Sequence, residues 1–225
     1  MTHLYVFGDS VVQGAWDPFG GWVQRVRSVL DEHYLYDPER RFLTFNMGVS
    51  GNSSACVLKR FSTEMEARYE DKADLIILFA VGLNDSLITS ESGTHRISEA
   101  DFKKNLQKLY ESASHYTDKI GFVGLHPINE AEVNPIPWAR DRAYWFNAVH
   151  SYNAIIKTFC ARQDISFIDV WQDWAEEPYE DWLFDGVHPN ATGHQKIARA
   201  VLKQFLKPLG WTVPPEQEGG FVTAN

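Results

Sequence analysis

Three residue types suited to nucleophilic catalysis stand near opposite ends of this 225-residue sequence. Ser10 closes a Gly8-Asp9-Ser10 tripeptide at the end of a short apolar run, whereas Asp185 and His188 are three positions apart near the other end. That spacing lets one turn bring the carboxylate beside the imidazole. Asp185 could then accept a hydrogen bond from Nδ1–H of His188, which leaves Nε2 free to take a proton from Ser10. The sequence therefore predicts Ser10 as nucleophile, His188 as base and Asp185 as the acid that orients it.

The residues around Asp185 and His188 favour a rigid turn over a position inside a helix. Gly186 permits a tight turn, Pro189 ends it and Asn190 can open a final helix. The other histidines have no comparable acidic partner nearby in sequence, and we interpret them as surface or core residues. His126 is the one to follow, since it stands just past a predicted strand. For Asp9 and Ser10 the simpler interpretation is turn and capping chemistry.

Strands and helices alternate along the chain that must position these residues. Residues 74–81 are apolar without alternation, which is typical of a strand buried on both faces in a parallel sheet. Apolar spacing of three to four residues and polar capping residues indicate the helices. This order predicts an α/β fold with helices on both faces of a parallel sheet. The predicted strands are residues 3–7, 42–46, 74–81, 119–125 and 165–170, and the predicted helices are residues 22–33, 53–69, 98–116, 139–163 and 190–206.

Two further polar turns follow predicted strands. One runs from Gly48 to Gly51, and the other contains Asn84. The carboxyl ends of parallel strands share one edge of a sheet, so these turns should converge on Ser10. The backbone N–H groups of Ser10 and Gly51 and the Nδ2 atom of Asn84 could then form an oxyanion hole for a tetrahedral acyl intermediate. Gly48 is a second candidate for the glycine donor. Taken singly, each turn has the composition of an ordinary strand-to-helix connection.

In their order and spacing, these blocks resemble those of the SGNH (GDSL) hydrolase superfamily over residues 4–206. The resemblance implies a three-layer α/β/α sandwich with a five-stranded parallel sheet of flavodoxin-like order. It also implies Ser10, Asp185 and His188 as catalytic residues, and Ser10, Gly51 and Asn84 as oxyanion donors. Gly51 is preferred to Gly48 because it lies in the Ser-Gly-Asn turn that matches the family block. The serine does not lie in a Gly-x-Ser-x-Gly elbow, which argues against the α/β-hydrolase fold.

One domain is expected over residues 1–207, followed by a tail, residues 208–225, that is mobile or packed on a neighbour. Residues 127–140 interrupt the alternation of elements with several prolines and follow the carboxyl end of a predicted strand. We interpret them as a pocket wall or lid, with a plain surface loop as the alternative.

Composition excludes several classes of function. The net charge of −9 argues against nucleic acid or anionic lipid as the main partner. Cys56 and Cys160 are expected as buried free thiols in helices, and no cysteine or histidine cluster indicates a metal site. No signal peptide and no apolar run long enough to span a membrane are visible, so a cytoplasmic location is expected, with a removed signal as the alternative.

The predicted activity is that of a serine esterase that hydrolyses small or short-acyl carboxylic esters through an acyl-enzyme on Ser10. This chemistry needs no metal or cofactor, and the partner is a small-molecule ester. Carbohydrate O-deacetylase, thioesterase and lysophospholipase activities stay open on the same site, as does a non-catalytic binding module of the same fold. Trp16, Phe19 and Trp138 are candidate substrate-binding residues, with a core position as the alternative for each. The oligomeric state is left open.

Overall fold

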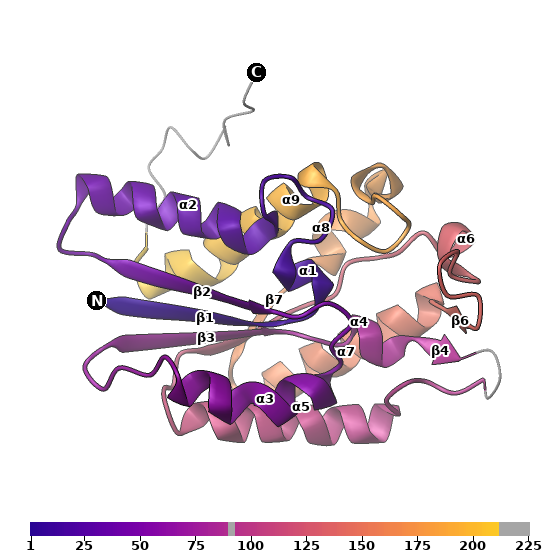
Figure 1. Ribbon diagram of the computed structural model, residues 1–225, viewed down its shortest axis with the longest axis horizontal. Coiled ribbons are helices and arrows are strands. Elements are labelled where there is room, and N and C mark those ends of the chain that lie inside the picture. The colour runs from indigo at the N-terminus through magenta and orange to yellow at the C-terminus, as the bar shows by residue number, and fades with distance from the viewer. Residues whose placement is uncertain (90–92, 212–225) are drawn as a thin grey trace.

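The computed structural model describes residues 1–89 and 93–211. Five parallel strands form one sheet in the order β2-β1-β3-β5-β7 (Figure 1). The first strand lies between the second and the third, so the predicted flavodoxin-like α/β fold is confirmed. The strands are β1 (Thr2–Gly8), β2 (Phe42–Gly48), β3 (Asp74–Ala80), β5 (Ile120–Val123) and β7 (Ser166–Ile168).

The register of the three strands around β1 aligns their ends. β1 pairs with β2 and β3 over its whole length, and Gly8 lies opposite Gly48 on one side and Ala80 on the other. The residues of β1 are buried throughout, as expected for a parallel strand covered on both faces. Because the three strands end level, the turns that follow them begin side by side at one edge of the sheet.

Helices cover both faces of the sheet and complete three layers (Figure 1). α2 packs against α9 on one face, whereas α3, α5 and α7 pack side by side on the other. Large apolar side chains fill the space between the layers, and the rings of Phe7, Phe61 and Phe79 lie 5.0 to 5.8 Å apart. The five long helices are α2 (Gly21–Tyr36), α3 (Ser54–Glu66), α5 (Glu99–Ser114), α7 (Phe146–Gln163) and α9 (Ala191–Val201).

Short elements connect the strands to the long helices. An antiparallel pair joins β4 to β6, away from the main sheet. These elements are α1 (Ser10–Gln13), α4 (Leu83–Ser86), β4 (Ile88–Thr89), α6 (Glu130–Val133), β6 (Arg142–Ala143), α8 (Trp171–Ala175) and the 3₁₀ turn η1 (Tyr179–Trp182).

The prediction that a helix begins near Ala139 was wrong, since α7 begins at Phe146. Arg142–Ala143 pair with β4 instead, and the backbone N–H of Tyr144 donates to the carbonyl of Val133 over 3.0 Å. These partners are distant in sequence and hold the stretch extended. A local reading of apolar spacing cannot reveal them.

The end of the described chain contacts the start of β2. α9 continues into a π-helical turn, Leu202–Leu206, and a 3₁₀ turn, Lys207–Leu209. The Trp211 ring lies 3.9 Å from that of Phe42, and Arg40 donates to the Gly210 carbonyl over 2.9 Å. Gly210 and Trp211, which belong to the predicted tail, therefore contact the domain itself, and residues 212–225 lie outside the described residues.

Cys56 on α3 and Cys160 on α7 are both free thiols. Cys160 is buried as expected, whereas Cys56 is only half-buried. Across residues 1–89 and 93–211, no helix has both the length and the apolar character needed to cross a membrane.

Candidate active site

Ser10 is the first residue of α1 and follows β1 after a single residue. The connection is tight, because a Cβ on Gly8 would lie 2.3 Å from Val12 Cγ2 and 2.4 Å from the Ala80 carbonyl oxygen. Asp9 caps the short helix by accepting the Val11 N–H over 2.9 Å. A glycine is thus needed at the strand end for Ser10 to reach the carboxyl edge of the sheet.

Ser10, His188 and Asp185 lie in line although 178 positions separate the serine from the histidine. Ser10 Oγ is 3.0 Å from His188 Nε2, and His188 Nδ1 is 2.8 Å from Asp185 Oδ2. The other carboxylate oxygen, Oδ1, accepts the backbone N–H of His188 over 2.8 Å. Two hydrogen bonds therefore fix the imidazole relative to the acid.

The turn that carries this pair depends on Gly186. Its φ is +83°, and a Cβ there would lie 2.7 Å from Glu132 Cβ. The turn packs closely against α6, and the Asn129 N–H donates to the Gly186 carbonyl over 2.8 Å. The Phe184 N–H donates to the His188 carbonyl over 2.8 Å and closes the turn from its other side. His188 therefore stands on a turn that is closed by its own hydrogen bond and held from outside by the segment at the start of α6.

The charge of Asp185 determines the tautomer of His188. Burial alone would raise the pKa of Asp185, but hydrogen bonds from the ring and the backbone of His188 outweigh it and lower the pKa below its ordinary value. An ionised carboxylate only accepts hydrogen bonds, so Nδ1 of His188 carries the proton. Nε2 is then the acceptor for the Ser10 hydroxyl. This arrangement can remove a proton from Ser10.

Asn84 projects from the turn after β3 and is oriented from both ends of its amide. Its Nδ2 atom donates to Asp9 Oδ2 over 3.0 Å, and the Tyr144 hydroxyl donates to its Oδ1 over 3.4 Å. The Asn84 amide has a second N–H, which can serve a ligand. Burial raises the pKa of Tyr144, so the phenol stays a hydrogen-bond donor at neutral pH.

The two glycines of the turn after β2 differ in their surroundings. The Gly48 N–H donates to Asn46 Oδ1 over 2.9 Å. Gly51 has a φ of +73°, and no atom lies within 4 Å of the place where its Cβ would be. Gly51 therefore stands on the open side of this turn, whereas the Gly48 N–H already has a partner within the strand end.

Two arginines hold the carbonyl groups of this turn and of the strand ends. Arg96 donates to the Gly51 carbonyl over 2.8 Å. Arg60 donates to the carbonyls of Gly8 and Met47, the last over 2.6 Å. These hydrogen bonds fix the backbone of the turn and of the two strand ends.

Asp85 ties the Asn84 turn to the start of α3. It is fully buried and accepts hydrogen bonds from both the backbone N–H and the hydroxyl of Ser54. Burial raises the pKa of Asp85 to about 6, with those hydrogen bonds opposing the shift. Asn105 donates to the same Ser54 hydroxyl over 2.9 Å. Asn84 and the glycine turn are thus linked through one buried carboxyl group.

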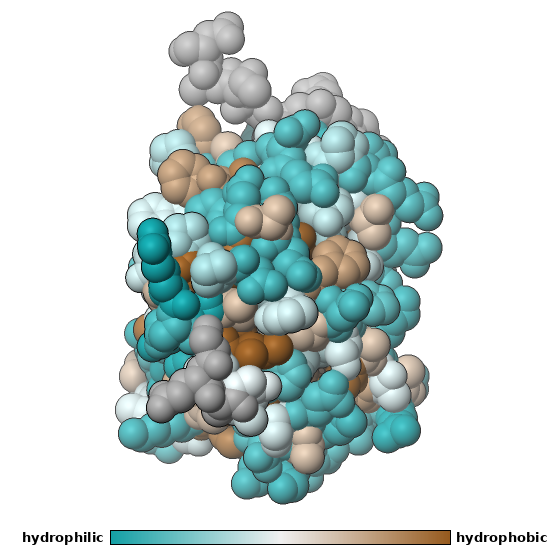
Figure 2. Space-filling model, turned by 90° about the vertical axis from the view of Figure 1, so that its right-hand side faces the viewer, coloured by the Kyte–Doolittle hydropathy of each residue, from teal (hydrophilic) through white to brown (hydrophobic). Residues whose placement is uncertain are grey.

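Two of the predicted aromatic residues flank His188 and one does not. The ring centroids of Trp16 and Trp138 lie 6.1 and 6.2 Å from that of His188. The Phe19 ring instead lies under the Arg25 guanidinium, and its centre is 5.2 Å from Arg25 Cζ. Figure 2 views the end of the molecule where the strands finish, and on its coloured part hydrophobic residues are scattered among hydrophilic ones.

Sequence reasoning missed two contacts of this site. Asp9 caps α1, as the turn interpretation expects, and its carboxylate also accepts a hydrogen bond from Asn84. Phe184 lies against Trp16 at 6.0 Å between ring centres. The sole signals available were that Asp9 adjoins Ser10 and Phe184 adjoins Asp185.

His126 belongs to the core, in keeping with the general interpretation of the other histidines. Its ring stacks on Trp174 at 5.2 Å, and Nδ1 donates to the Pro127 carbonyl over 2.9 Å. Burial lowers the pKa of His126 to about 4, so the ring is neutral at physiological pH. In the part of the chain that the structure describes, no three His, Cys, Asp or Glu side chains gather as metal ligands.

Comparison with known proteins gives one family match. The model of the GDSL-like lipase/acylhydrolase family matches residues 6–196, which is most of the chain. No curated protein is similar enough in sequence to count as a match.

Solved structures with the same fold cover nearly the whole chain. A lipase/acylhydrolase from Enterococcus faecalis is 18% identical with a TM-score of 0.72, covering 92% of this chain and 97% of its own. An acetylxylan esterase from Geobacillus stearothermophilus is 20% identical with a TM-score of 0.69, covering 91% and 94%. An α/β hydrolase from the metagenome of Lake Arreo, Spain, has the same identity, TM-score and coverage. At these identities the likeness establishes the fold.

Proposed function

Since the chain belongs to the GDSL-like lipase/acylhydrolase family and is a carboxylic ester hydrolase, we propose that it hydrolyses small or short-acyl esters through an acyl-enzyme on Ser10. The observation that carries this proposal is the line of hydrogen bonds from Ser10 Oγ to His188 Nε2, 3.0 Å, and from His188 Nδ1 to Asp185, 2.8 Å. A hydroxyl that donates to a neutral imidazole backed by a carboxylate is the usual activated serine.

In the first half-reaction, Ser10 Oγ forms a bond to the ester carbonyl carbon and its proton passes to His188 Nε2. The carbonyl electron pair moves onto the oxygen, which the N–H groups of Ser10 and Gly51 and the Asn84 amide stabilise. When the tetrahedral intermediate collapses, the bond to the alcohol oxygen breaks. His188 gives its proton to that oxygen, so a neutral alcohol leaves.

In the second half-reaction, water attacks the acyl-enzyme and gives a proton to His188 Nε2. The bond between the acyl carbon and Ser10 Oγ then breaks, and the proton returns to Ser10. The carboxylic acid leaves and the enzyme is regenerated. Asp185 keeps its negative charge throughout and stabilises the imidazolium that forms twice in each cycle.

The proposed acyl group is small. Ser10 and Asn84 are themselves largely buried, and Tyr144 closes the space beside the Asn84 amide. Hydrophobic residues are scattered on this end of the molecule (Figure 2), unlike the broad apolar face that docking on a lipid surface needs. An acetyl ester fits these limits, and the Geobacillus stearothermophilus relative is named for that chemistry. Carbohydrate O-deacetylation is therefore the first alternative to test beside thioester and lysophospholipid hydrolysis.

Labelling with a fluorophosphonate, followed by peptide mapping, tests the nucleophile. We expect modification at Ser10, competition by a short ester, and no labelling of Ser10→Ala. The turnover of Ser10→Ala should fall by roughly 10⁴–10⁶. Near-normal turnover by Ser10→Ala would refute the mechanism, and an unlabelled protein without activity would indicate a binding module.

A panel of p-nitrophenyl esters of rising chain length, run beside acetylated sugars, a thioester and a lysophospholipid, tests the substrate. We expect kcat/KM to be highest for acetate and to fall with chain length. A maximum at eight or more carbons would overturn the short-acyl part of the proposal and leave the nucleophile assignment standing.

A further inference from the structure

We propose that Trp16, Trp138 and Phe184 form the binding site for the alcohol part of the ester, and that this alcohol is a sugar ring. The inference rests on the proposed function, because it starts from the step in which His188 hands a proton to the leaving oxygen. An alcohol that receives a proton from Nε2 must lie beside the imidazole ring. The residues that flank His188 therefore line the alcohol side, whereas Asn84 and Tyr144 lie on the oxyanion side.

Trp16 and Trp138 come from different parts of the chain and reach His188 from separate positions. Trp16 meets the imidazole at an interplanar angle of 89°, and Trp138 at 33°. Their side chains are 59% and 57% exposed, although both are large and apolar. Phe184, 64% exposed, extends the Trp16 surface at an angle of 35°. Three exposed aromatic rings thus surround the place where the alcohol leaves.

The backbone of Trp16 is in a conformation that its side chain disfavours. Its φ is +64°, in the left-handed region, where a bulky non-glycine residue is strained. In the described part of the chain the only other such residue is Asp164, which ends α7. Strained residues of this kind concentrate at functional sites. Because the Trp16 side chain is exposed, packing does not explain this conformation. We infer that the strained backbone is kept because it places the ring beside His188.

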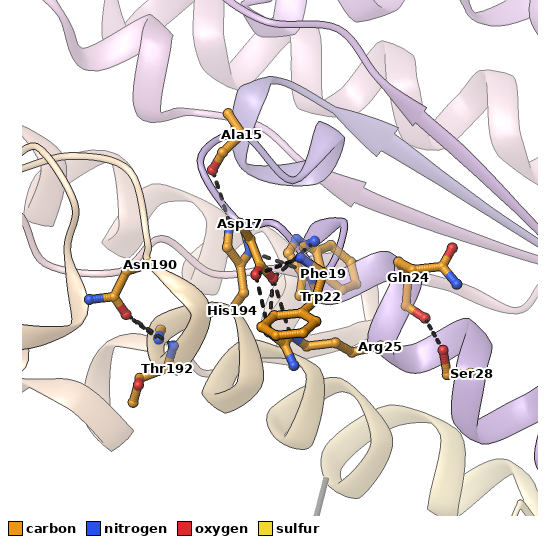
Figure 3. Close-up of polar contacts among 12 residues, drawn as sticks. Ala15, Asp17, Phe19, Trp22, Gln24, Arg25, Ser28, Asn190, Thr192 and His194 are labelled. Carbon is orange, nitrogen blue, oxygen red and sulfur yellow. Dashed lines mark hydrogen bonds and ion pairs between the residues drawn. The ribbon is translucent and has the colours of Figure 1, made fainter. Parts of the chain in front are cut away.

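A buried network holds the loop that carries Trp16 (Figure 3). Asp17 accepts hydrogen bonds from Arg25, from the Phe19 N–H and from the Gly21 N–H, all between 3.0 and 3.2 Å. Its side chain is fully buried in this ion pair. A buried acid with a bidentate arginine and two backbone donors forms a rigid anchor. Asp17 directly follows Trp16, so the anchor acts on the strained residue itself.

His194 fixes the other side of Trp16. Its Nδ1 accepts the Trp22 N–H over 3.2 Å, which leaves the proton on Nε2, directed at the Ala15 carbonyl 3.4 Å away (Figure 3). Of the two neighbours of Trp16, Ala15 is therefore tied to α9 and Asp17 to α2. A subsite held in this way is preorganised for its ligand.

A sugar ring matches this surface better than an alkyl chain does. The C–H face of a pyranose packs on a flat indole, while its hydroxyl groups stay in water around an open site. An alkyl chain would gain most from an enclosed apolar pocket, and these rings are more than half exposed. An aryl alcohol shares the flat ring, so the experiment separates the two.

The test compares Trp16→Gly and Trp16→Asn with Tyr36→Ala. Glycine and asparagine both accept the left-handed conformation, so they remove the ring without adding strain. Tyr36 is an exposed aromatic residue at the end of α2, remote from the carboxyl edge of the sheet, and serves as the matched control. The substrates are acetylated glucose and xylose, p-nitrophenyl acetate, and 2,2,2-trifluoroethyl acetate, whose alcohol has no ring.

We expect KM for at least one sugar acetate to rise on the order of tenfold in both Trp16 variants, with kcat nearly unchanged. Turnover of trifluoroethyl acetate should change less than about twofold, and Tyr36→Ala should match the wild type. Trp16→Gly should melt at the same temperature as the wild type or higher, because the strain is relieved. A merely structural role of the indole would instead lower the melting temperature.

Three results would overturn the inference. Equal losses of kcat on all substrates would mean that Trp16 positions His188, and unchanged KM values would mean that it binds nothing. A loss on p-nitrophenyl acetate alone would assign the site to aryl alcohols. Binding without catalysis is tested in Ser10→Ala. Methyl glucoside and methyl xyloside should quench its tryptophan fluorescence, and this quenching should be lost in Ser10→Ala/Trp16→Asn. A failure of the esterase mechanism therefore remains distinguishable from a failure of the subsite.

Discussion

The side-chain amide of Asn84 donates a hydrogen bond to the carboxylate of Asp9 over 3.0 Å, and Asp9 is the residue immediately before the proposed nucleophile. The bond joins the turn after β1 to the turn after β3 across 75 positions. Asp9 also accepts the Val11 N–H at the start of α1. One carboxylate thereby sets the position of Ser10 and the orientation of Asn84 together.

Asp9→Asn should lower kcat by about tenfold to a hundredfold with little change in KM. An asparagine cannot accept from both Val11 and Asn84, because one of its two ends is a donor. The Asn84 amide would then turn and present its oxygen to the oxyanion. Steady-state kinetics on p-nitrophenyl acetate measures the effect, and retained fluorophosphonate labelling would show that Ser10 and His188 are intact.

Asn84→Ala should lower kcat by roughly 10²–10³, the usual loss for one oxyanion donor. Asp9→Asn added to Asn84→Ala should cause no further loss, because the new side-chain oxygen can still accept the Val11 N–H and only the contact with Asn84 is lost. A double variant whose losses multiply would show that Asp9 has a separate role.

Asp185→Asn should lower kcat by on the order of 10³–10⁴ while the protein stays folded. An amide in place of the carboxylate would favour the wrong tautomer of His188, because Nδ1 would no longer face a pure acceptor. The amide oxygen can still accept the His188 and Val187 N–H groups, so the turn keeps its hydrogen bonds and the loss falls on the ring contact alone. If kcat falls by less than tenfold in a variant whose circular dichroism spectrum matches that of the wild type, Asp185 does not have this role.

Gly186→Ala should destabilise the fold by about 1–3 kcal/mol and reduce activity. The new Cβ would meet Glu132 Cβ at 2.7 Å in addition to the cost of a φ of +83°. Gly210 has a φ of +87° with nothing within 4 Å of its Cβ position, so Gly210→Ala isolates the backbone cost. Urea unfolding of both variants should give a larger loss for Gly186→Ala, and equal losses would contradict the steric argument.

Stability should depend on pH through His194. Burial lowers the pKa of His194 to about 4, against the opposing effects of the Ala15 carbonyl and Asp17. A histidine that is neutral in the folded state contributes stability above its unfolded pKa, and that contribution is lost as the pH falls from about 6.5 toward 4. At pH 5 the loss from this one group should be about 2 kcal/mol.

The measurement compares urea unfolding of the wild type and His194→Gln at pH 7 and pH 5. Glutamine can accept from Trp22 and donate to Ala15 but does not titrate. We expect the wild type to lose more stability than the variant between these pH values. The same loss in both proteins would assign the pH dependence to other groups, of which His126 is the first candidate.

Much of the fold could be predicted from local patterns. The apolar runs of β1 and β3 indicated buried parallel strands, and the alternation of elements indicated the layers. The start of α7 could not be predicted, because its boundary depends on the pairing of Arg142–Ala143 with β4. The aromatic residue Phe19 was a candidate for the site by its position in a loop, yet its ring lies against Arg25.

By itself the sequence determined the residues that can do chemistry and the one local contact among them, since a spacing of three places Asp185 beside His188 within a single turn. Register is a property of strands that meet only after folding, so the tertiary structure alone decided that Ser10 lies 3.0 Å from His188. It likewise decided that Asp9 orients Asn84 and that Trp16 and Trp138 flank the imidazole. These contacts join segments whose separation in sequence carries no local signal, and packing of the sheet edge brings them together.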